Sequence, residues 1–442
     1  NIIPPIVWGY DEFGAIVSHL ELDNPAYTDI YREYLVNLGI TNPTILEFII
    51  TNIFPIIVVP VRWTYAIGIS PILGVSRLID IDWPLLGTFL LIPYIFFAML
   101  GTYLVSLSVV SDERHQNVIF FFLSFILLSH PFLKWTLTLT SYSHHLFCFG
   151  LLLYSEVKLK PDNKMLSKAA LLRSVVQVFN YQYIVIVAIL GLFELIRNFR
   201  SFFKEKIYLN WLLPGIVAII SVCLLVLRSQ VSGKHSNPAY TGNTEIYDFA
   251  NNIDGLFSSL GYLISRLVDF LYYYFIQTES YYGGPNNFEI SLLGVSLFIL
   301  ACIFIYLNYW KKANTKLKQT LLIFVIALLI PYLLSIQPFL ATRHSLILFL
   351  PLALIFSFTI CIFLESFFAK KYVTLASILL LMFSAYNAIG FNKDRSENLN
   401  IEKIAPILSQ YAVKQLVLSP CEYRPILYAE IRKRYKVSYR CG

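Results

Sequence analysis

Residues 345–364 read SLILFLPLALIFSFTICIFL, twenty consecutive residues without a charge. An α-helix needs about 20 predominantly apolar residues to cross the hydrocarbon core of a bilayer. Residues 85–107 form a second uncharged run of sufficient length. The whole chain follows this trend, because 57% of its 442 residues are hydrophobic and only 14% are charged, against about 25% in a soluble domain. We therefore expect an all-α polytopic membrane protein.

The remaining apolar runs set the expected number of spans. Ten spans are predicted within the chain. A further helix is expected upstream, ending near Ile6, and would bring the total to about eleven. The stretch 43–78 is apolar but carries four prolines. Because proline breaks or kinks helices, we predict juxtamembrane or re-entrant helices there. The ten spans predicted within the chain lie at about 84–107, 117–133, 137–155, 169–179, 181–196, 207–227, 290–310, 319–337, 345–365 and 372–391.

Basic residues are confined mainly to alternate loops. If residues 1–42 lie outside, the spans place five short loops inside, and these loops hold fifteen Lys and Arg residues. Cytoplasmic loops are enriched in Lys and Arg. Residues 11–82, on the opposite side, contain nine Asp and Glu against three Arg. The opening segment is therefore predicted to face the exterior. The five loops are 108–116, 156–168, 197–206, 311–318 and 366–371.

The chain divides into a first extracytoplasmic loop (1–83), a transmembrane bundle with an outer loop (84–391, with 228–289), and a small C-terminal α/β unit (392–442). In the last unit, Gln415–Leu418 is a predicted strand between helices over 399–411 and 426–435. The unit is expected outside despite its basic residues, because folded domains translocate regardless of charge. Cys421 and Cys441 could pair there in an oxidising compartment or remain free thiols.

The acidic pair Asp11-Glu12 lies between the expected upstream span and the first apolar run. Trp8, Tyr10 and Phe13 frame it, and Trp and Tyr are enriched at membrane interfaces. A carboxylate in a half-buried site can have a shifted pKa and can act as a general base. The alternative is a solvated surface pair or a helix N-cap.

This arrangement resembles the GT-C superfamily of integral-membrane glycosyltransferases, which use lipid-phosphate-linked sugars. In that family an acidic motif follows the first helix, juxtamembrane helices come next, and roughly ten or more spans follow. Tyr10-Asp11-Glu12 matches the motif, and residues 43–77 match the juxtamembrane region. Residues 129–132 and 141–145 resemble the outer hairpin after the third span. The resemblance rests mostly on architecture and covers most of the chain.

The resemblance implies an inverting transfer from a polyprenyl-phosphate or diphosphate sugar to a lipid, glycan or protein acceptor. Asp11 would be the general base, and Glu12 a supporting acid or the alternative base. Arg343 and His344, just before Leu346–Pro351, resemble a late "Arg-Tyr … Leu-Pro" pattern of bacterial members. The guanidinium would bind phosphate oxygens, and His344 could donate to the same phosphate. The alternative for Arg343 is an interfacial anchor.

Tyr142, His144 and His145, which we predict to bind the substrate together with Tyr10, lie near the outer end of the predicted span 137–155. The alternative for both histidines is ordinary polar contacts within the bundle. Adjacent histidines cannot share one helix face, so at most one of them faces a cavity. Some family members place an acid in this hairpin and use it to hold a divalent cation. Because no acid lies between Ser129 and Gly150, we favour transfer without a metal or other cofactor, although a histidine could replace the acid as a ligand.

A polar stripe of Arg173, Gln177, Asn180 and Gln182 runs along two short predicted helices. Polar residues within a membrane usually face a bundle interior or a cavity. Residues 177–183 could line the donor site at the outer leaflet, with Gln177 and Asn180 as substrate-binding residues. Packing hydrogen bonds would explain it equally well.

Two other functions stay open. A lipid-linked sugar flippase or transporter would carry inverted repeats and midplane charges, and the chain shows no repeat. An O-antigen-type polymerase or ligase would place its basic residues in a long late loop, whereas Arg343 lies in a short one. No nucleotide-binding motif stands in a suitable context, and no nucleic-acid partner is expected. The predicted location is a bacterial plasma membrane, with the active site outside; the endoplasmic reticulum is the alternative.

Overall fold

The structure is a computed structural model, and the part of the chain that it describes is mostly helical. This part consists of residues 83–110, 114–136, 144–160, 163–180, 182–231, 270–271, 273–275, 315–333, 346–397, 415–418 and 438–441. Several predicted features lie outside it, namely the juxtamembrane stretch 43–78, the span 290–310, most of the loop 228–289, both tail helices and Cys421.

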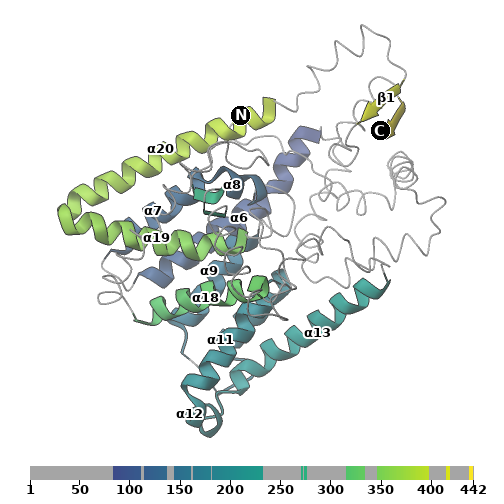
Figure 1. Ribbon diagram of the computed structural model, residues 1–442, viewed down its shortest axis with the longest axis vertical. Coiled ribbons are helices and arrows are strands. Elements are labelled where there is room, and N and C mark those ends of the chain that lie inside the picture. The colour runs from purple at the N-terminus through teal and green to yellow at the C-terminus, as the bar shows by residue number, and fades with distance from the viewer. Residues whose placement is uncertain are drawn as a thin grey trace, which may run out of the picture. The chain divides into compact units, whose positions relative to one another are not determined.

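Helices occupy the predicted spans that the structure describes (Figure 1). Most begin and end within a few residues of the predicted limits. Two short predicted spans, 169–179 and 181–196, are indeed separate short helices. The helices are α6 (Trp83–Val109), α7 (His115–Leu128), α8 (His130–Thr136), α9 (His145–Lys158), α10 (Lys168–Phe179), α11 (Tyr183–Arg197), α12 (Phe199–Lys204), α13 (Leu209–Val231), α18 (Thr315–Leu333), α19 (Leu346–Phe367) and α20 (Lys370–Glu397).

The predicted span 117–133 differs from the structure, because it is divided into α7 and α8 at Ser129. Ser129 has extended backbone angles, with φ −78° and ψ 92°. Its hydroxyl accepts a hydrogen bond from the backbone N–H of Phe132 at 3.4 Å, as an N-cap residue does. Pro131 then lies in the first turn of α8, where a missing N–H costs nothing. Serine and proline together therefore end one helix and start the next.

Three helices in the described part are long and apolar enough to cross a membrane, over Ile92–Val109, Leu346–Phe367 and Lys370–Ile389. The first and third of these segments are only 28% and 22% buried, and the second, α19, is 78% buried. Exposed apolar side chains recur every three or four residues along α20, so one face of that helix is apolar. An apolar stripe of this length on an exposed face is expected to contact lipid. Its members are Tyr372, Leu375, Leu379, Met382, Tyr386 and Ile389.

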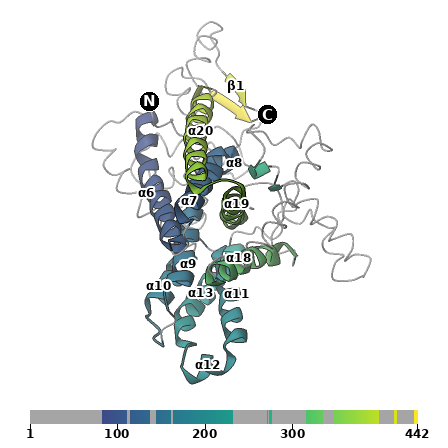
Figure 2. The same cartoon turned by 90° about the vertical axis from the view of Figure 1, so that its left-hand side faces the viewer.

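The centre of the bundle is α19, which packs against α7, α9 and α18. Figure 2 looks nearly along α19, with α7 beside it and α18 below it. Aromatic rings fill the contact on one side: Phe349 lies 5.1 Å from Phe132 and 5.3 Å from Tyr274, measured between ring centroids. Because α19 is buried on nearly all sides, its sequence is apolar all round rather than amphipathic.

Polar contacts join the turns that the charge pattern predicts to face inside. Arg114, just before α7, forms a 2.5 Å ion pair with Glu365 at the end of α19. Arg197, at the end of α11, donates a 2.8 Å hydrogen bond to Gln319 near the start of α18. Each contact links two turns of the same predicted side, which supports the predicted alternation of loops.

The chain forms two compact units, one of residues 97–136 and 144–388, the other of residues 1–96, 137–143 and 389–442. All the helix contacts above belong to the first unit. In the second, the predicted strand β1 (Gln415–Leu418) is present and pairs in parallel with β2 (Ser438–Cys441), which the sequence analysis missed. Parallel strands need a long crossover connection, and the nineteen residues 419–437 are long enough to supply one.

Candidate functional site

Four of the predicted substrate-binding residues are described by the structure: His144, His145, Gln177 and Asn180. The predicted catalytic pair and the remaining substrate-binding residues lie outside the described part, so their placement stays a prediction. These residues are Tyr10, Asp11, Glu12, Tyr142, Arg343 and His344.

His145 and Asn180, 35 residues apart, meet where α9 begins and α10 ends. The amide nitrogen of Asn180 lies 3.3 Å from Nδ1 of His145 and 3.4 Å from Nε2. The hydroxyl of Tyr183, at the start of α11, donates to the carbonyl of His145 at 2.9 Å. All three residues are at most 2% exposed. We call these three residues the His145 cluster.

The hydrogen bonds of Asn180 fix the state of His145. The side-chain oxygen of Asn180 accepts from the backbone N–H of Gln182 at 3.0 Å, so its NH₂ group faces the imidazole. An NH₂ group only donates, and the ring nitrogen that it contacts must therefore carry a lone pair. His145 is thus a neutral acceptor here, which suits a fully buried side chain.

His144 and Gln177 are also buried, at 1% exposed each. The ring of His144 makes edge contacts with Phe97 and Phe179, each at 5.5 Å between centroids. The side-chain oxygen of Gln177 has no hydrogen-bond partner in the part of the chain that the structure describes. The two histidines therefore point into different surroundings, as their adjacent positions require, and both are enclosed by protein.

The His145 cluster lies at membrane depth if the basic turns lie at one interface, as predicted. Helices α9 and α10 have 14 and 12 residues, which at 1.5 Å per residue span only about 21 and 18 Å. The hydrocarbon core is about 30 Å thick. Non-helical backbone at this depth must be buried in protein or line a cavity. Asn180 has non-helical backbone angles, φ −152° and ψ 112°, and it is buried in protein as this rule requires. Its side-chain oxygen accepts a hydrogen bond from the backbone N–H of Gln182 in the turn.

Replacing Asn180 by alanine should lower the free energy of unfolding by about 1–3 kcal/mol, because it leaves buried polar groups of His145 and Gln182 without these partners. Denaturation of the purified chain in mild detergent would measure this. Ser366→Ala is a matched control, since the Ser366 hydroxyl bonds only a carbonyl one turn away on an exposed face. We expect it to change stability by less than about 0.5 kcal/mol. Equal effects of the two changes would contradict the role given to Asn180.

A second polar site, which was not predicted from the sequence, lies where α9, α10, α11 and α18 meet. A cavity of about 380 Å³ opens there. Its charged residues come from four helices, and its other lining residues are partly apolar and partly polar. One sequence signal could have found it: two acids lie near the ends of predicted spans beside loops that are otherwise basic. The charged residues are Glu156, Arg173, Glu194, Arg197 and Lys316.

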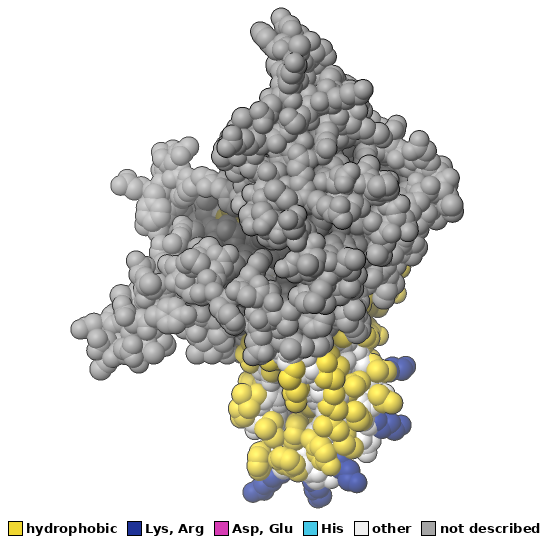
Figure 3. Space-filling view, turned by 90° about the vertical axis from the view of Figure 1, so that its right-hand side faces the viewer, with side chains coloured by type: hydrophobic (Ala, Val, Ile, Leu, Met, Phe, Trp, Pro, Cys, Tyr) yellow, Lys and Arg dark blue, Asp and Glu magenta, His cyan; other side chains and the backbone are white. Residues whose placement is uncertain are grey.

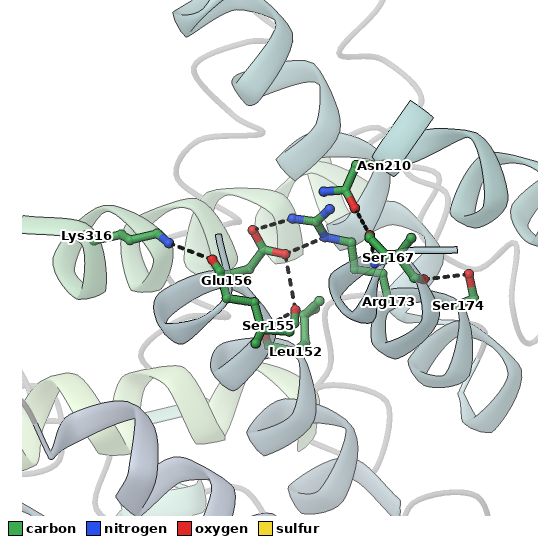
Figure 4. A network of polar contacts seen from close by, with 10 residues as sticks. Leu152, Ser155, Glu156, Ser167, Arg173, Ser174, Asn210 and Lys316 are labelled. Carbon is green, nitrogen blue, oxygen red and sulfur yellow. Dashed lines mark hydrogen bonds and ion pairs between the residues drawn. The ribbon is translucent and has the colours of Figure 1, made fainter. Parts of the chain in front are cut away.

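Arg173, placed by the sequence in the polar stripe, is the buried centre of this second site. Its guanidinium bonds the carboxylate of Glu156 through two nitrogens, at 2.6 and 3.0 Å (Figure 4). It also lies over the ring of Trp211, 3.7 Å from the centroid. Gly191 of α11 also lies close to that ring, because a Cβ atom there would come within 2.9 Å of the indole. Arg173 therefore joins α9, α10 and α13.

Lys316 lies beside this pair. Its ammonium donates to the backbone carbonyl of Leu159 at 3.2 Å, and this bond is the dashed line that leaves Lys316 in Figure 4. Partial burial lowers the pKa of Lys316, while the carboxylates of Glu156 and Glu194 act in the opposite direction.

Among the described residues, no group of three or more His, Cys, Asp or Glu side chains could hold a metal ion. The predicted catalytic acids are not among the residues searched. No protein-family model, curated protein or solved structure matches the chain. The function must therefore be argued from the chain itself.

Proposed function

We propose that the chain is an integral-membrane glycosyltransferase of the GT-C type. It would move a sugar from a polyprenyl-phosphate or diphosphate donor to a lipid, glycan or protein acceptor in the biosynthesis of cell-envelope polysaccharide. The proposal rests on the acidic pair in a segment that the charge pattern predicts to lie outside. Membrane-spanning helices and contacts between predicted inner turns support it.

In the proposed reaction, an acceptor oxygen attacks the anomeric carbon of the donor sugar. The bond between that carbon and the phosphate oxygen breaks, the anomeric configuration inverts, and the lipid phosphate leaves. Asp11 would take the proton of the acceptor, with Glu12 as its support or substitute. Arg343 would bind the departing phosphate through paired hydrogen bonds, and His344 would add a donor.

The observation that carries this proposal within the described part is the contact between His145 and Asn180. Two residues predicted from separate motifs to serve one site are hydrogen-bonded where α9 begins and α10 ends. Because the cluster is buried, we assign it a positioning role: it would hold the start of α9 against the end of α10. Tyr142, two residues before His144, would bind the sugar.

Replacing Asp11 by asparagine should lower the transfer rate by about 100-fold or more, because a general base typically contributes 10²–10⁴-fold. The assay uses the purified full chain in proteoliposomes with a labelled polyprenyl-phosphate sugar and membrane-lipid acceptors. Asp23→Asn, a second acid of the same opening segment, is the control and should retain activity.

Three outcomes of this assay are informative. Near wild-type transfer by the Asp11→Asn variant would refute its assignment as the base, and loss in Glu12→Gln alone would move that role to Glu12. Movement of the labelled lipid across the bilayer without a new glycosidic product would instead support the flippase alternative.

A further inference from the structure

The turn between α11 and α13 carries the short helix α12, whose exposed side chains form two adjacent stripes. Residues four apart on a helix lie on one face, so Phe199 and Phe203 form an aromatic stripe, and Arg200 and Lys204 form a basic one. The two phenylalanines are 61% and 54% exposed, and both basic residues are exposed. Phe202, between the stripes, is buried and faces the protein. We call residues 199–206 the α12 tip.

The backbone of the α12 tip is strained at Lys206, which follows the C-cap residue Glu205. Lys206 has a φ of 57°, and no other non-glycine residue in the described part has a positive φ. Its N–H donates to the carbonyl of Phe203 at 3.3 Å, as the residue after the C-cap does in a Schellman motif. Glycine adopts this conformation at no steric cost. The turn therefore carries a charged side chain at a position where the backbone favours glycine.

The charges of the α12 tip are not balanced within the protein. The tip contains three basic residues, Arg200, Lys204 and Lys206, against one acid, Glu205. None of the three basic side chains forms a hydrogen bond or an ion pair in the part of the chain that the structure describes. The tip is therefore a surface of net positive charge that is open to a partner.

An exposed apolar surface continues from the α12 tip along both helices of the hairpin. On α11, Leu192 and Ile196 are 55% and 68% exposed, and on α13, Leu212 and Ile219 are 44% and 66% exposed. Figure 3 shows this end of the molecule as an apolar surface that ends in Lys and Arg side chains. Apolar, then aromatic, then basic side chains is the order typical of a membrane interface.

We propose that the α12 tip binds anionic phospholipids of the leaflet on the predicted inner side. Phe199 and Phe203 would lie at the level of the headgroups, and Arg200, Lys204 and Lys206 would bind the phosphate groups. The net positive charge of the tip selects anionic lipids over zwitterionic ones, and the exposed aromatic side chains favour a bilayer surface over a soluble anion. This lipid site does not depend on the proposed sugar transfer, which we place at the outer face.

The test uses the full chain purified in detergent and titrated with phosphatidylglycerol, which is anionic, or with phosphatidylcholine, which is zwitterionic. Native mass spectrometry measures the bound lipid. We expect the wild-type chain to bind phosphatidylglycerol more tightly. The double variant Arg200→Ala/Lys204→Ala should weaken this binding by about tenfold or more, because each basic residue near an anionic surface contributes roughly fivefold. Its binding of phosphatidylcholine should stay at the wild-type level.

A second variant, Lys206→Gly, separates the charge of this residue from the strain of its backbone. It should raise the Tm by about 1–2 °C, because glycine adopts a positive φ without strain. It should also weaken phosphatidylglycerol binding by about fivefold, whereas Lys206→Arg should keep the binding. A purely structural role of Lys206 would give a changed Tm with unchanged lipid binding, and that result would overturn its assignment.

The matched control is Lys370→Ala/Lys371→Ala, which removes two exposed cations at the start of α20, outside the α12 tip. This variant should retain more of the phosphatidylglycerol binding than Arg200→Ala/Lys204→Ala does. Circular dichroism and gel filtration establish that each variant is folded. Equal losses in the two double variants would overturn the site, because the effect would then belong to surface charge in general.

Glu205→Gln gives a test of opposite sign, because it removes the one acid of the α12 tip. It should strengthen the binding of phosphatidylglycerol, and a weaker binding would contradict the charge argument. Displacement of the lipid by inorganic phosphate would overturn the bilayer surface in favour of a free anion. Equal binding of both lipids by the wild-type chain would overturn the proposal as a whole.

Discussion

Replacing Glu156 by alanine is expected to lower the free energy of unfolding by about 3–5 kcal/mol, because it leaves a buried guanidinium without its counter-ion. The side chain of Arg173 is 3% exposed and that of Glu156 is 10% exposed, so water reaches neither freely. Both oxygens of the carboxylate accept from the guanidinium. Trp211 contacts the guanidinium face and cannot replace the lost charge. Unfolding of the detergent-purified chain would measure the loss.

The ion pair of Arg114 with Glu365 is the matched control. Its side chains are 23% and 16% exposed, more than those of the first pair. Glu365→Ala should therefore cost less, on the order of 1 kcal/mol. The double replacement Glu156→Leu/Arg173→Met should recover much of the loss, because a buried ion pair is often no more stable than an apolar pair of similar volume. Equal losses in the two single variants would contradict the burial argument.

Composition and periodicity were enough to predict the helices but not the partners of their polar residues. The apolar run at 345–364 predicts a spanning helix, and α19 is a helix that is long and apolar enough to cross a membrane. Arg173 is predicted, from its position, to be an intramembrane polar residue that faces the interior, and it is 3% exposed. Its partner Glu156 lies 17 residues away across a turn. Hydrophobic spacing describes one helix at a time, so it contains no information about which helix the guanidinium faces.

In the candidate site, too, the sequence predicts the individual residues but not the contacts between them. Asn180 and His145 were each predicted from the chemistry of short motifs, yet their contact depends on how α9 turns back onto α10. The parallel strand β2 is a further case, because its four residues, Ser438–Cys441, carry no apolar alternation strong enough to predict a strand. Its hydrogen bonds come from β1, about twenty residues upstream. Long-range pairing, rather than local preference, determines both features.

Replacing Gly150 by valine is expected to lower the free energy of unfolding by about 3 kcal/mol or more, because the backbones of α6 and α9 touch at this residue. A Cβ atom on Gly150 would overlap the carbonyl oxygen of Gly101 and lie 2.9 Å from its carbonyl carbon. A Cβ atom on Gly101 would lie 2.7 Å from the Cα of Phe147. The atoms in the way are backbone atoms, which no rotamer change can move. Small residues permit such close crossings of membrane helices.

Gly215 of α13 provides the matched control, because a Cβ atom there would have no other atom within 4 Å. The same change, Gly215→Val, should therefore cause no loss and a gain of a few tenths of a kcal/mol, because valine has a higher helix propensity than glycine. The two variants add identical atoms to helical glycines, and only the crossing partner differs. Thermal unfolding of both in one detergent would compare them directly. Equal shifts of Tm would show that α6 and α9 do not cross at these glycines. A large loss confined to Gly150→Val would mean that the crossing fixes α9, and with it His145 at its first turn, relative to α6.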